Sequence, residues 1–273
     1  MFYSGVSIDD EASMRDPLDM SGKVVIVTGG CRGVGKGIAT RFAERGARVV
    51  VCCRHAPDAH AADGHTFVQA DVREPAQIEA VVAKTVELFG RIDVLVNNAG
   101  GSPYADAATA SPRFFQSIIA LNLTAPLVFS QKVNAVMQAQ AEGGAIVNIA
   151  SVSGTRPSPG TAAYGAAKAG LLNLTQTLGV EWAPKVRVNA ITAGLIQTEA
   201  AHDHYGDDEG IRAVSATVPN GRMATPDDIA GVCLFLASDL ASYVTGANLL
   251  VHGGGERPAF LVAAQAAAAK HKE

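Results

Sequence analysis

The sequence has few cysteines, and their positions suggest neither a metal site nor a disulfide framework. The four are Cys31, Cys52, Cys53 and Cys233. None forms a C-x-x-C pair, and none has histidines at metal-ligand spacing. Adjacent Cys52 and Cys53 would point to opposite faces of a strand, as small buried side chains do. We therefore expect no zinc and no disulfide framework, and a reducing cytoplasm as the compartment.

Charge is also scarce, and no long hydrophobic run is present. Charged residues make up 18% of the chain, the net charge is −4, and the lysines and arginines are scattered. Nucleic acid is therefore not an expected partner, because phosphate binding needs a basic stripe. The first residues lack a basic-then-apolar signal layout, and no run of about 18 apolar residues follows, so no membrane span is expected.

Apolar residues are plentiful enough to bury a sizeable core. Of 273 residues, 48% are hydrophobic, which suits one large α/β domain. Residues 1–20 are polar and unpatterned and predict a loose leader. We expect a single domain over 21–255, followed by a tail over 256–273 whose composition favours a helix.

Runs of β-branched residues alternate with segments of helical periodicity along this domain. Strands are predicted at 23–28, 47–53, 66–70, 93–97, 145–150, 186–191 and 248–251, and helices at 33–45, 75–89, 111–139, 161–182 and 226–237. Apolar strands separated by helices indicate a parallel sheet flanked by helices on both faces. Right-handed crossovers then give a doubly wound, Rossmann-type α/β fold with ligands at the carboxyl ends of its strands.

One connection, residues 194–219, is longer than a simple turn requires. It follows a strand end and is polar at its centre (HDHYGDDEG). Loops of this length in compact domains are usually functional, so we expect a lid. His202 and His204 lie in it without a third ligand, which favours a solvated loop over a metal site.

Glycines follow the first predicted strand in the segment TGGCRGVG, residues 28–35. At a strand-to-helix turn, glycines let the backbone approach a pyrophosphate, whose charge the helix N-terminus stabilises. The overlapping stretch from Gly30 to Lys36 matches most of a triphosphate-binding loop. Gly37, however, stands where a magnesium-binding Ser or Thr is required, so a dinucleotide site is favoured over an ATPase site.

Five ordered segments resemble the short-chain dehydrogenase/reductase family. They are the glycine loop, the pair Asp71-Val72, the NNAG segment at 97–100, Asn122 in LNLTAP, and Ser151 with the pair Tyr164 and Lys168 in Y-x-x-x-K. The similarity spans roughly residues 23–254. It implies an oxidoreductase that transfers a hydride between a nicotinamide cofactor and a carbonyl or alcohol substrate.

The resemblance also assigns the site residues. The expected catalytic residues are Asn122, Ser151, Tyr164 and Lys168, and no metal ligands are expected. The expected cofactor-binding residues are Thr28, Gly29, Arg32, Gly33, Val34, Gly35, Arg54, Asp71, Val72, Asn98, Ala99, Gly100, Tyr164, Lys168, Gly194, Ile196 and Thr198. By resemblance, Asp71 and Val72 meet adenine, Lys168 binds the nicotinamide ribose, and Asn122 holds a water that links Lys168 to solvent.

The chemistry of Tyr164 follows from its spacing to Lys168. Four residues apart on a helix, the two side chains share one face. A tyrosine pKa near 10 is too high for a base at neutral pH, and a nearby ammonium would lower it. Ser151 ends a strand, where its hydroxyl can polarise the substrate oxygen. Tyr164 is therefore the predicted acid/base.

Two positions depart from the family pattern, and two other functions stay open. Ala193-Gly194 replaces Pro-Gly, which relaxes the backbone beside the nicotinamide, and His252 replaces an Asp before two glycines.

An enoyl reductase usually has a wider tyrosine-to-lysine spacing. A cofactor-sensing regulator without turnover generally lacks part of the catalytic set that this sequence keeps.

The expected cofactor is NADP(H) rather than NAD(H). An NAD-binding fold normally places an acid at the end of the second strand to bind the ribose 2′-hydroxyl. Here Cys53 holds that place, Arg54 follows it, and Arg32 lies in the glycine loop. Both arginines could reach a 2′-phosphate. The absence of an acid at the end of the second strand is a stronger indication of NADP(H) than the arginines are.

A homotetramer with two-fold axes is expected. The predicted helices at 111–139 and 161–182 carry apolar positions broad enough to pack on both the sheet and a partner: Phe114, Ile118, Leu121, Leu171, Leu174 and Leu178. By resemblance, these helices form the main dimer contact.

Overall fold

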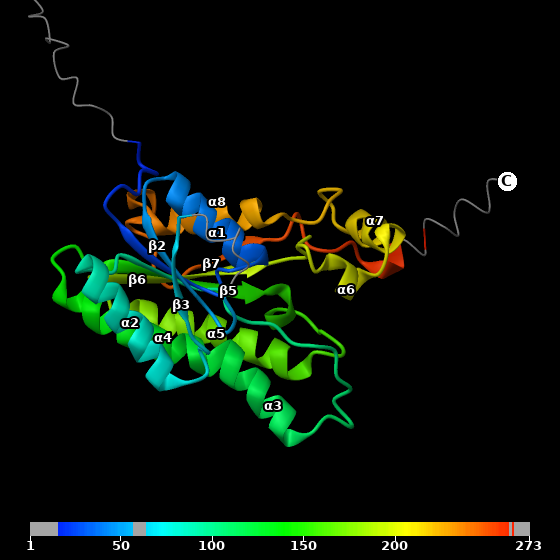
Figure 1. Ribbon diagram of the computed structural model, residues 1–273. Coiled ribbons are helices and arrows are strands. Elements are labelled where there is room, and N and C mark those ends of the chain that lie inside the picture. The colour runs from blue at the N-terminus through cyan, green and yellow to red at the C-terminus, as the bar shows by residue number, and fades with distance from the viewer. Residues whose placement is uncertain (1–15, 57–63, 262–263, 265–273) are drawn as a thin grey trace, which may run out of the picture.

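A computed structural model describes residues 16–56, 64–261 and 264 of the chain. All seven predicted strands are present and form one parallel sheet in the order β3-β2-β1-β4-β5-β6-β7 (Figure 1). The strands are β1 (Val24–Thr28), β2 (Arg48–Cys53), β3 (Thr66–Gln69), β4 (Val94–Asn97), β5 (Gly144–Ser151), β6 (Val186–Ala193) and β7 (Asn248–Val251). The chain order reverses between β1 and β4, where such folds bind ligands.

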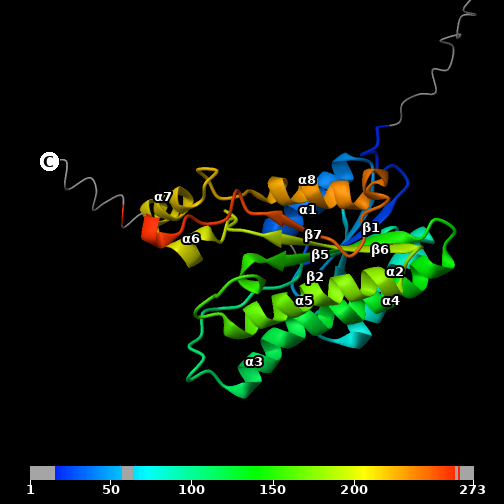
Figure 2. The same cartoon turned by 180° about the vertical axis from the view of Figure 1, so that it is seen from behind.

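Helices cover both faces of the sheet, which confirms the doubly wound fold (Figures 1 and 2). One face carries α1 (Gly33–Glu44) and α8 (Pro226–Ala237), whose Ile38, Phe42 and Ile229 are fully buried. The other carries α2 (Pro75–Phe89), α4 (Ala125–Ala139) and α5 (Ala162–Glu181). Buried apolar side chains form a separate core cluster on each face. The sheet is therefore covered on both sides, and its carboxyl-end edge carries the loops.

Local signals explain why these helices begin and end where they do. Helix α2 begins with Pro75 and ends at Gly90, whose φ of 74° is left-handed and suits glycine. Helix α8 follows a capping box, in which the Thr225 side chain accepts from the Asp228 amide and the Asp228 carboxylate accepts from Thr225. These caps fix the helix ends that flank the sheet.

The predicted loop at 194–219 is wrong in detail. It contains two short helices, α6 (Ala201–Tyr205) and α7 (Asp208–Thr217). The Asp207 carboxylate caps α7 by accepting from two backbone amides. Buried Ala201, Ile211 and Met223 form a small cluster of their own. Such short, polar helices give little periodic signal, because too few apolar positions recur.

The predicted helix at 111–139 is interrupted. It comprises α3 (Pro112–Ile119), a five-residue π-helix (Ala120–Thr124) and α4. Among the described residues, this continuous run alone has the length and hydropathy of a membrane span. It packs against α2 and α5 and against the sheet, as covering helices of soluble folds do.

Two further predictions fall mainly on residues outside those described. They are the leader over 1–20, of which only 16–20 are described, and the tail over 256–273, of which 256–261 and 264 are described. Two short 3₁₀ turns, Val152–Gly154 and Asp239–Ala241, complete the described elements.

Candidate active site

The glycine loop between β1 and α1 requires glycine at two of its positions, Gly29 and Gly35. Gly29 has a φ of 66°, and its amide donates to the carbonyl of Cys52 over 2.8 Å. A Cβ at Gly35 would lie 2.2 Å from the Gly29 carbonyl oxygen. The loop therefore holds its backbone open at the start of α1, which is the arrangement a pyrophosphate requires.

Thr28 joins this loop to the NNAG segment. Its hydroxyl accepts from the amides of Asn98 and Ala99, each over 2.9 Å, and it is buried. The Asn98 side-chain amide donates to the carbonyls of Thr28 and Gly29. The carboxyl ends of β1 and β4 are thus fixed to each other by four hydrogen bonds.

A cleft of about 770 Å³ opens over these strand ends. It is lined by 15 of the 17 residues predicted to bind the cofactor, the exceptions being Thr28 and Thr198, and by Ser151. Thr28 lies beneath the cleft as a support. The structure thus brings the predicted residues to one place, while their roles stay predictions.

Sequence reasoning missed several residues of the cleft. Arg73 donates to both carboxylate oxygens of Asp71, which lowers the pKa of Asp71. Glu199 reaches in from the segment after β6, and its carboxylate accepts from the Gly33 amide over 2.7 Å. Arg73 lies only two residues after Asp71, so the sequence itself could have indicated this ion pair. The approach of Glu199, 166 residues from Gly33, had no such signal in the sequence.

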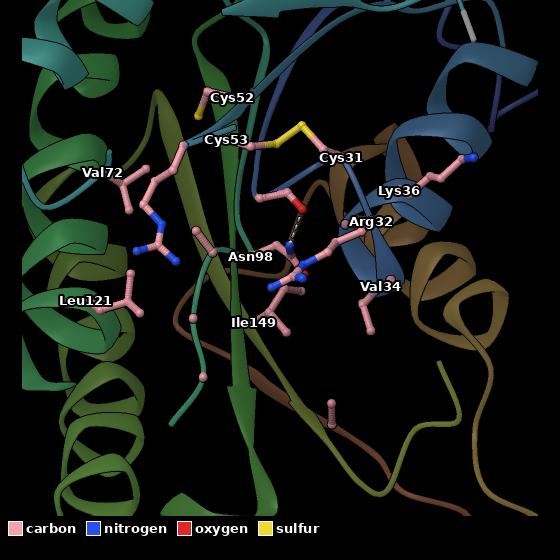
Figure 3. A pocket seen from close by; sticks show the side chains of 18 of the residues that line it. Cys31, Arg32, Val34, Lys36, Cys52, Cys53, Val72, Asn98, Leu121 and Ile149 are labelled. Atoms are coloured by element: carbon pink, nitrogen blue, oxygen red, sulfur yellow. Dashed lines mark hydrogen bonds between the residues drawn. A yellow bond between two sulfur atoms is a disulfide. The ribbon is translucent and has the colours of Figure 1, made fainter. Parts of the chain in front are cut away.

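The cysteine prediction is wrong. Cys31 of the glycine loop and Cys53 at the end of β2 form a disulfide, with their Cα atoms 6.4 Å apart (Figure 3). Cys52 and Cys233 are free and buried. The cysteine spacing carried no disulfide signal, because the bridge depends on the fold bringing a loop beside a strand end. Cys53 is thus not the neutral free side chain on which the cofactor prediction relied.

Three predicted catalytic residues line the floor of the cleft beside β5. Ser151 ends β5, and Tyr164 and Lys168 project from α5. The Lys168 ammonium is buried, donates to the Ile149 carbonyl over 2.7 Å, and lies 5.6 Å from the centre of the Tyr164 ring. The hydroxyls of Ser151 and Tyr164 thus belong to the cleft lining, and the Lys168 ammonium lies close to the Tyr164 ring.

The π-helix positions the fourth predicted residue, Asn122. Its side-chain amide donates to the carbonyls of Gly101 and Ile118, and its oxygen accepts from the Gly101 amide, each over 2.9 Å. A Cβ at Gly100 would lie 2.7 Å from that oxygen and 3.2 Å from the Lys168 nitrogen. Asn122 is therefore close to Lys168 although it does not line the cleft. Single-turn π-helices often mark functional sites.

The electrostatics differ from the expectation for Tyr164. Burial raises the pKa of Tyr164, a hydrogen bond from Ser151 lowers it, and the nearby Tyr205 raises it. Burial lowers the pKa of Lys168 to about 8. The expected lowering by the ammonium is absent, because the Lys168 nitrogen lies over the ring and donates to a backbone carbonyl rather than to the hydroxyl.

Gly194, next to the departure at Ala193, packs against the backbone of the other departure, His252. The Gly194 amide donates to the Val251 carbonyl, and a Cβ at position 194 would lie 2.7 Å from the Cβ of His252 and 2.8 Å from its Cα. This contact restricts position 194 to glycine, but it would arise with any side chain at 252, and nothing in the structure explains the changes to Ala193 and His252. Elsewhere, the His202 ring is hydrogen-bonded to the Gly206 carbonyl. Within the described ranges, no group of three His, Cys, Asp or Glu could hold a metal ion.

Comparisons with known proteins identify a matching family model and several similar proteins. A family model described as enoyl-(acyl carrier protein) reductase matches residues 29–256. D-threitol dehydrogenase from Mycolicibacterium smegmatis is 36% identical, over 89% of this chain and 96% of that protein. L-rhamnose 1-dehydrogenase (NAD(P)(+)) from Azotobacter vinelandii is 37% identical, over 85% and 96%.

A third similar sequence and a similar solved structure were also found. The 3-oxoacyl-[acyl-carrier-protein] reductase of Vibrio cholerae is 37% identical, over 87% of this chain and 98% of that protein. The ligand-free aldohexose dehydrogenase of Thermoplasma acidophilum superposes with a TM-score of 0.81 and 32% identity, over 86% of this chain and 94% of that one.

Proposed function

This chain belongs to the short-chain dehydrogenase/reductase family, and we propose that it interconverts secondary alcohols and carbonyls with NADP(H) as its preferred cofactor. Membership makes it an NAD(P)-dependent oxidoreductase acting on alcohols or carbonyls. The observation that carries the proposed mechanism is the convergence of Ser151, Tyr164 and Lys168 on one cleft below the glycine loop.

The cleft fits a dinucleotide. Its glycine loop leaves no room for a side chain at Gly35, and the backbone at the start of α1 offers the Gly33 amide to an anion. Tyr164 and Lys168 line the same cleft. A bound nicotinamide cofactor would supply or accept the hydride there.

Each catalytic side chain has a proposed task. The Tyr164 hydroxyl donates a proton to the carbonyl oxygen in reduction and takes one from the alcohol in oxidation. The Ser151 hydroxyl donates to the same substrate oxygen and orients it. Lys168 places a positive charge behind the ring, and Asn122 holds the Gly101 backbone close to it.

We propose polyols or sugars as the first substrates to test. The supporting observation is that three of the similar proteins named above are a threitol, a rhamnose and an aldohexose dehydrogenase. A panel of polyols, aldoses, ketones and acyl thioesters, each assayed with both cofactors, tests the class. Turnover of acyl thioesters alone would overturn it.

The preference for NADP(H) rests on charge at the adenosine end of the cleft. Arg32 and Arg54 line it and are exposed, and no acid stands at the end of β2. Asp71 is engaged by Arg73 and does not supply a free carboxylate to this end. A 2′-phosphate would thus meet two cations, while the nearby Asp71 carboxylate is already paired with Arg73.

The pH dependence should differ between the two directions. Because burial raises the pKa of Tyr164, the tyrosine is protonated at neutral pH and is ready to act as an acid. We expect kcat/KM for alcohol oxidation to rise about tenfold per pH unit from about pH 6 to about pH 8, and kcat/KM for carbonyl reduction to stay nearly flat. Initial rates in buffers of constant ionic strength measure both. An oxidation rate that falls with pH would contradict the assignment.

Glu199 should oppose cofactor binding. Its carboxylate occupies the Gly33 amide at the start of α1, where a pyrophosphate would bind. An anion at a helix N-terminus is worth about 0.3–1 kcal/mol, so Glu199→Gln should lower the Kd for NADPH by about two- to fivefold. Fluorescence titration measures it, with Glu209→Gln on α7 as the control. Weaker binding by Glu199→Gln would show instead that the carboxylate helps to hold the cofactor.

An enoyl reductase is the second candidate, since the matching family model carries that description. The four-residue spacing of Tyr164 and Lys168 disfavours it. Assaying an enoyl thioester beside a ketone separates the two. A cofactor sensor without turnover would show thermal stabilisation by the dinucleotide but no substrate-dependent oxidation of it.

The homotetramer and the cytoplasmic location stay proposals. Of the apolar positions named for a two-sided interface, Ile118, Leu171 and Leu178 are buried within the chain itself. Leu127 on α4 and Val180 on α5 are exposed and are better placed to meet a partner.

A further inference from the structure

The Cys31–Cys53 disulfide lies in the wall of the cofactor cleft rather than in a core. Both residues line the cleft and are half-buried. Figure 3 shows the bridge spanning from the glycine loop to the end of β2, while the Cys52 side chain points away from it. The sulfur atoms are thus open to small molecules that enter the cleft.

The neighbouring cysteines cannot substitute for this pair. Cys52 is fully buried, and burial raises its pKa to about 12, so it stays a thiol. Cys233 belongs to α8, and its side chain is buried in the core on that face of the sheet. Exchange chemistry requires a thiolate and access. Among the four cysteines, only Cys31 and Cys53 have that access.

The bridge joins the two walls between which the adenosine ribose must enter. In this type of fold, the last residue of the second strand lies beside the ribose 2′ oxygen, and the glycine loop lies opposite. Here those positions are Cys53 and Cys31, and each is followed by an arginine. The bridge holds the walls together with the Cα atoms 6.4 Å apart and places two sulfur atoms between them.

We propose that Cys31 and Cys53 form a thiol–disulfide exchange site for low-molecular-weight thiols, and that opening the bridge strengthens binding of a 2′-phosphorylated dinucleotide. The bridge and two small thiols give two cysteine thiols and one small disulfide. A small thiolate first attacks one sulfur to form a mixed disulfide, and a second small thiolate then displaces that cysteine. Arg32 and Arg54 place positive charge where the thiolate approaches.

We expect stronger binding after the bridge opens because the opened site has more space and more hydrogen-bond donors. A disulfide has no hydrogen-bond donor, whereas each free thiol has a weak one and can rotate away from the ribose. Opening the bridge also lets the Arg32 backbone adjust to a phosphate. The effect should be larger for NADPH than for NADH, because the 2′-phosphate needs the most room. The bridged protein is thus the form with weak cofactor binding, and a reducing environment opens it.

The test compares the full-length protein after treatment with oxidised glutathione and after treatment with dithiothreitol, each followed by desalting. Alkylation under denaturing conditions, read by mass spectrometry, should count two more thiols in the reduced protein. Fluorescence titration should give a Kd for NADPH at least about fivefold lower in the reduced protein, with a smaller ratio for NADH.

The variants give the decisive comparison. The double variant that combines Cys31→Ser with Cys53→Ser can form neither the bridge nor a mixed disulfide with glutathione at this place, so it should bind NADPH like the reduced protein after either treatment. Cys233→Ala removes a thiol elsewhere and should keep the full response. An equal Kd in both redox states, a lower Kd in the oxidised state, no difference in thiol count, or a response that survives in the double variant would each overturn the proposal. Tighter binding of NADH than NADPH in both states would instead refute only the cofactor preference.

Discussion

Replacing Tyr164 by phenylalanine is expected to lower kcat/KM by about 10²–10⁴-fold while cofactor affinity stays nearly unchanged. The hydroxyl is the only part of this side chain that can exchange a proton with the substrate oxygen. The ring, which Lys168 overlies at 5.6 Å from its centre, is retained in phenylalanine. The floor of the cleft should therefore keep its shape.

Steady-state kinetics and a cofactor titration on the same preparation separate the two effects. Tyr243→Phe provides the matched control, because Tyr243 is fully exposed and does not line the cleft. It should match the wild type in both measurements. Activity of Tyr164→Phe within about tenfold of wild type would reject Tyr164 as the acid/base, since general acid–base catalysis contributes more than that.

The second large effect concerns the cofactor. Wild-type protein, kept reduced, should have a higher kcat/KM with NADPH than with NADH. Arg32→Ala should raise the KM for NADPH about tenfold to 150-fold and change that for NADH much less, because one charge-assisted hydrogen bond is worth about 1.5–3 kcal/mol. Arg113→Ala, which removes a charge outside the cleft, is the control. A wild type that uses NADH at least as efficiently would refute the preference.

Cys53→Asp tests the same cofactor preference by adding an acid instead of removing an arginine. It supplies the acid that binds a ribose 2′-hydroxyl and repels a phosphate, so preference should move toward NADH. Because the substitution also removes the bridge, Cys53→Ser is its proper reference. A shift equal to that of Cys53→Ser would show that the lost bridge, rather than the added acid, causes it.

The fold was readable from the sequence because its signals are local. β-Branched runs such as Val24–Thr28, and helix-ending Gly90, determine elements within a few residues of themselves. The order of these elements then leaves few topologies open. The glycine loop and the Y-x-x-x-K spacing of Tyr164 and Lys168 are likewise short patterns, and the structure brings them to one cleft.

What the sequence missed depends on contacts between distant segments. The Cys31–Cys53 bridge forms across 22 residues, and the Glu199 contact joins the segment after β6 to the start of α1, 166 residues away. The pKa of Tyr164 follows from burial and from where the Lys168 nitrogen points, and neither is encoded in a spacing of four. The π-helix around Asn122 has the composition of an ordinary helix and differs only in its hydrogen bonds.

At that π-helix, a change that raises the stability of the fold is expected to lower catalytic activity. Its wider turn gives poorer backbone hydrogen bonds than an α-helix, so deleting one residue between Ala120 and Thr124 would let α3 and α4 join in a single regular register. Such a deletion would also rotate Asn122 away from Gly101 and Lys168. An engineer who selects this protein only for heat resistance would therefore favour changes here that cost turnover, and screens for stabilised variants should leave this turn intact.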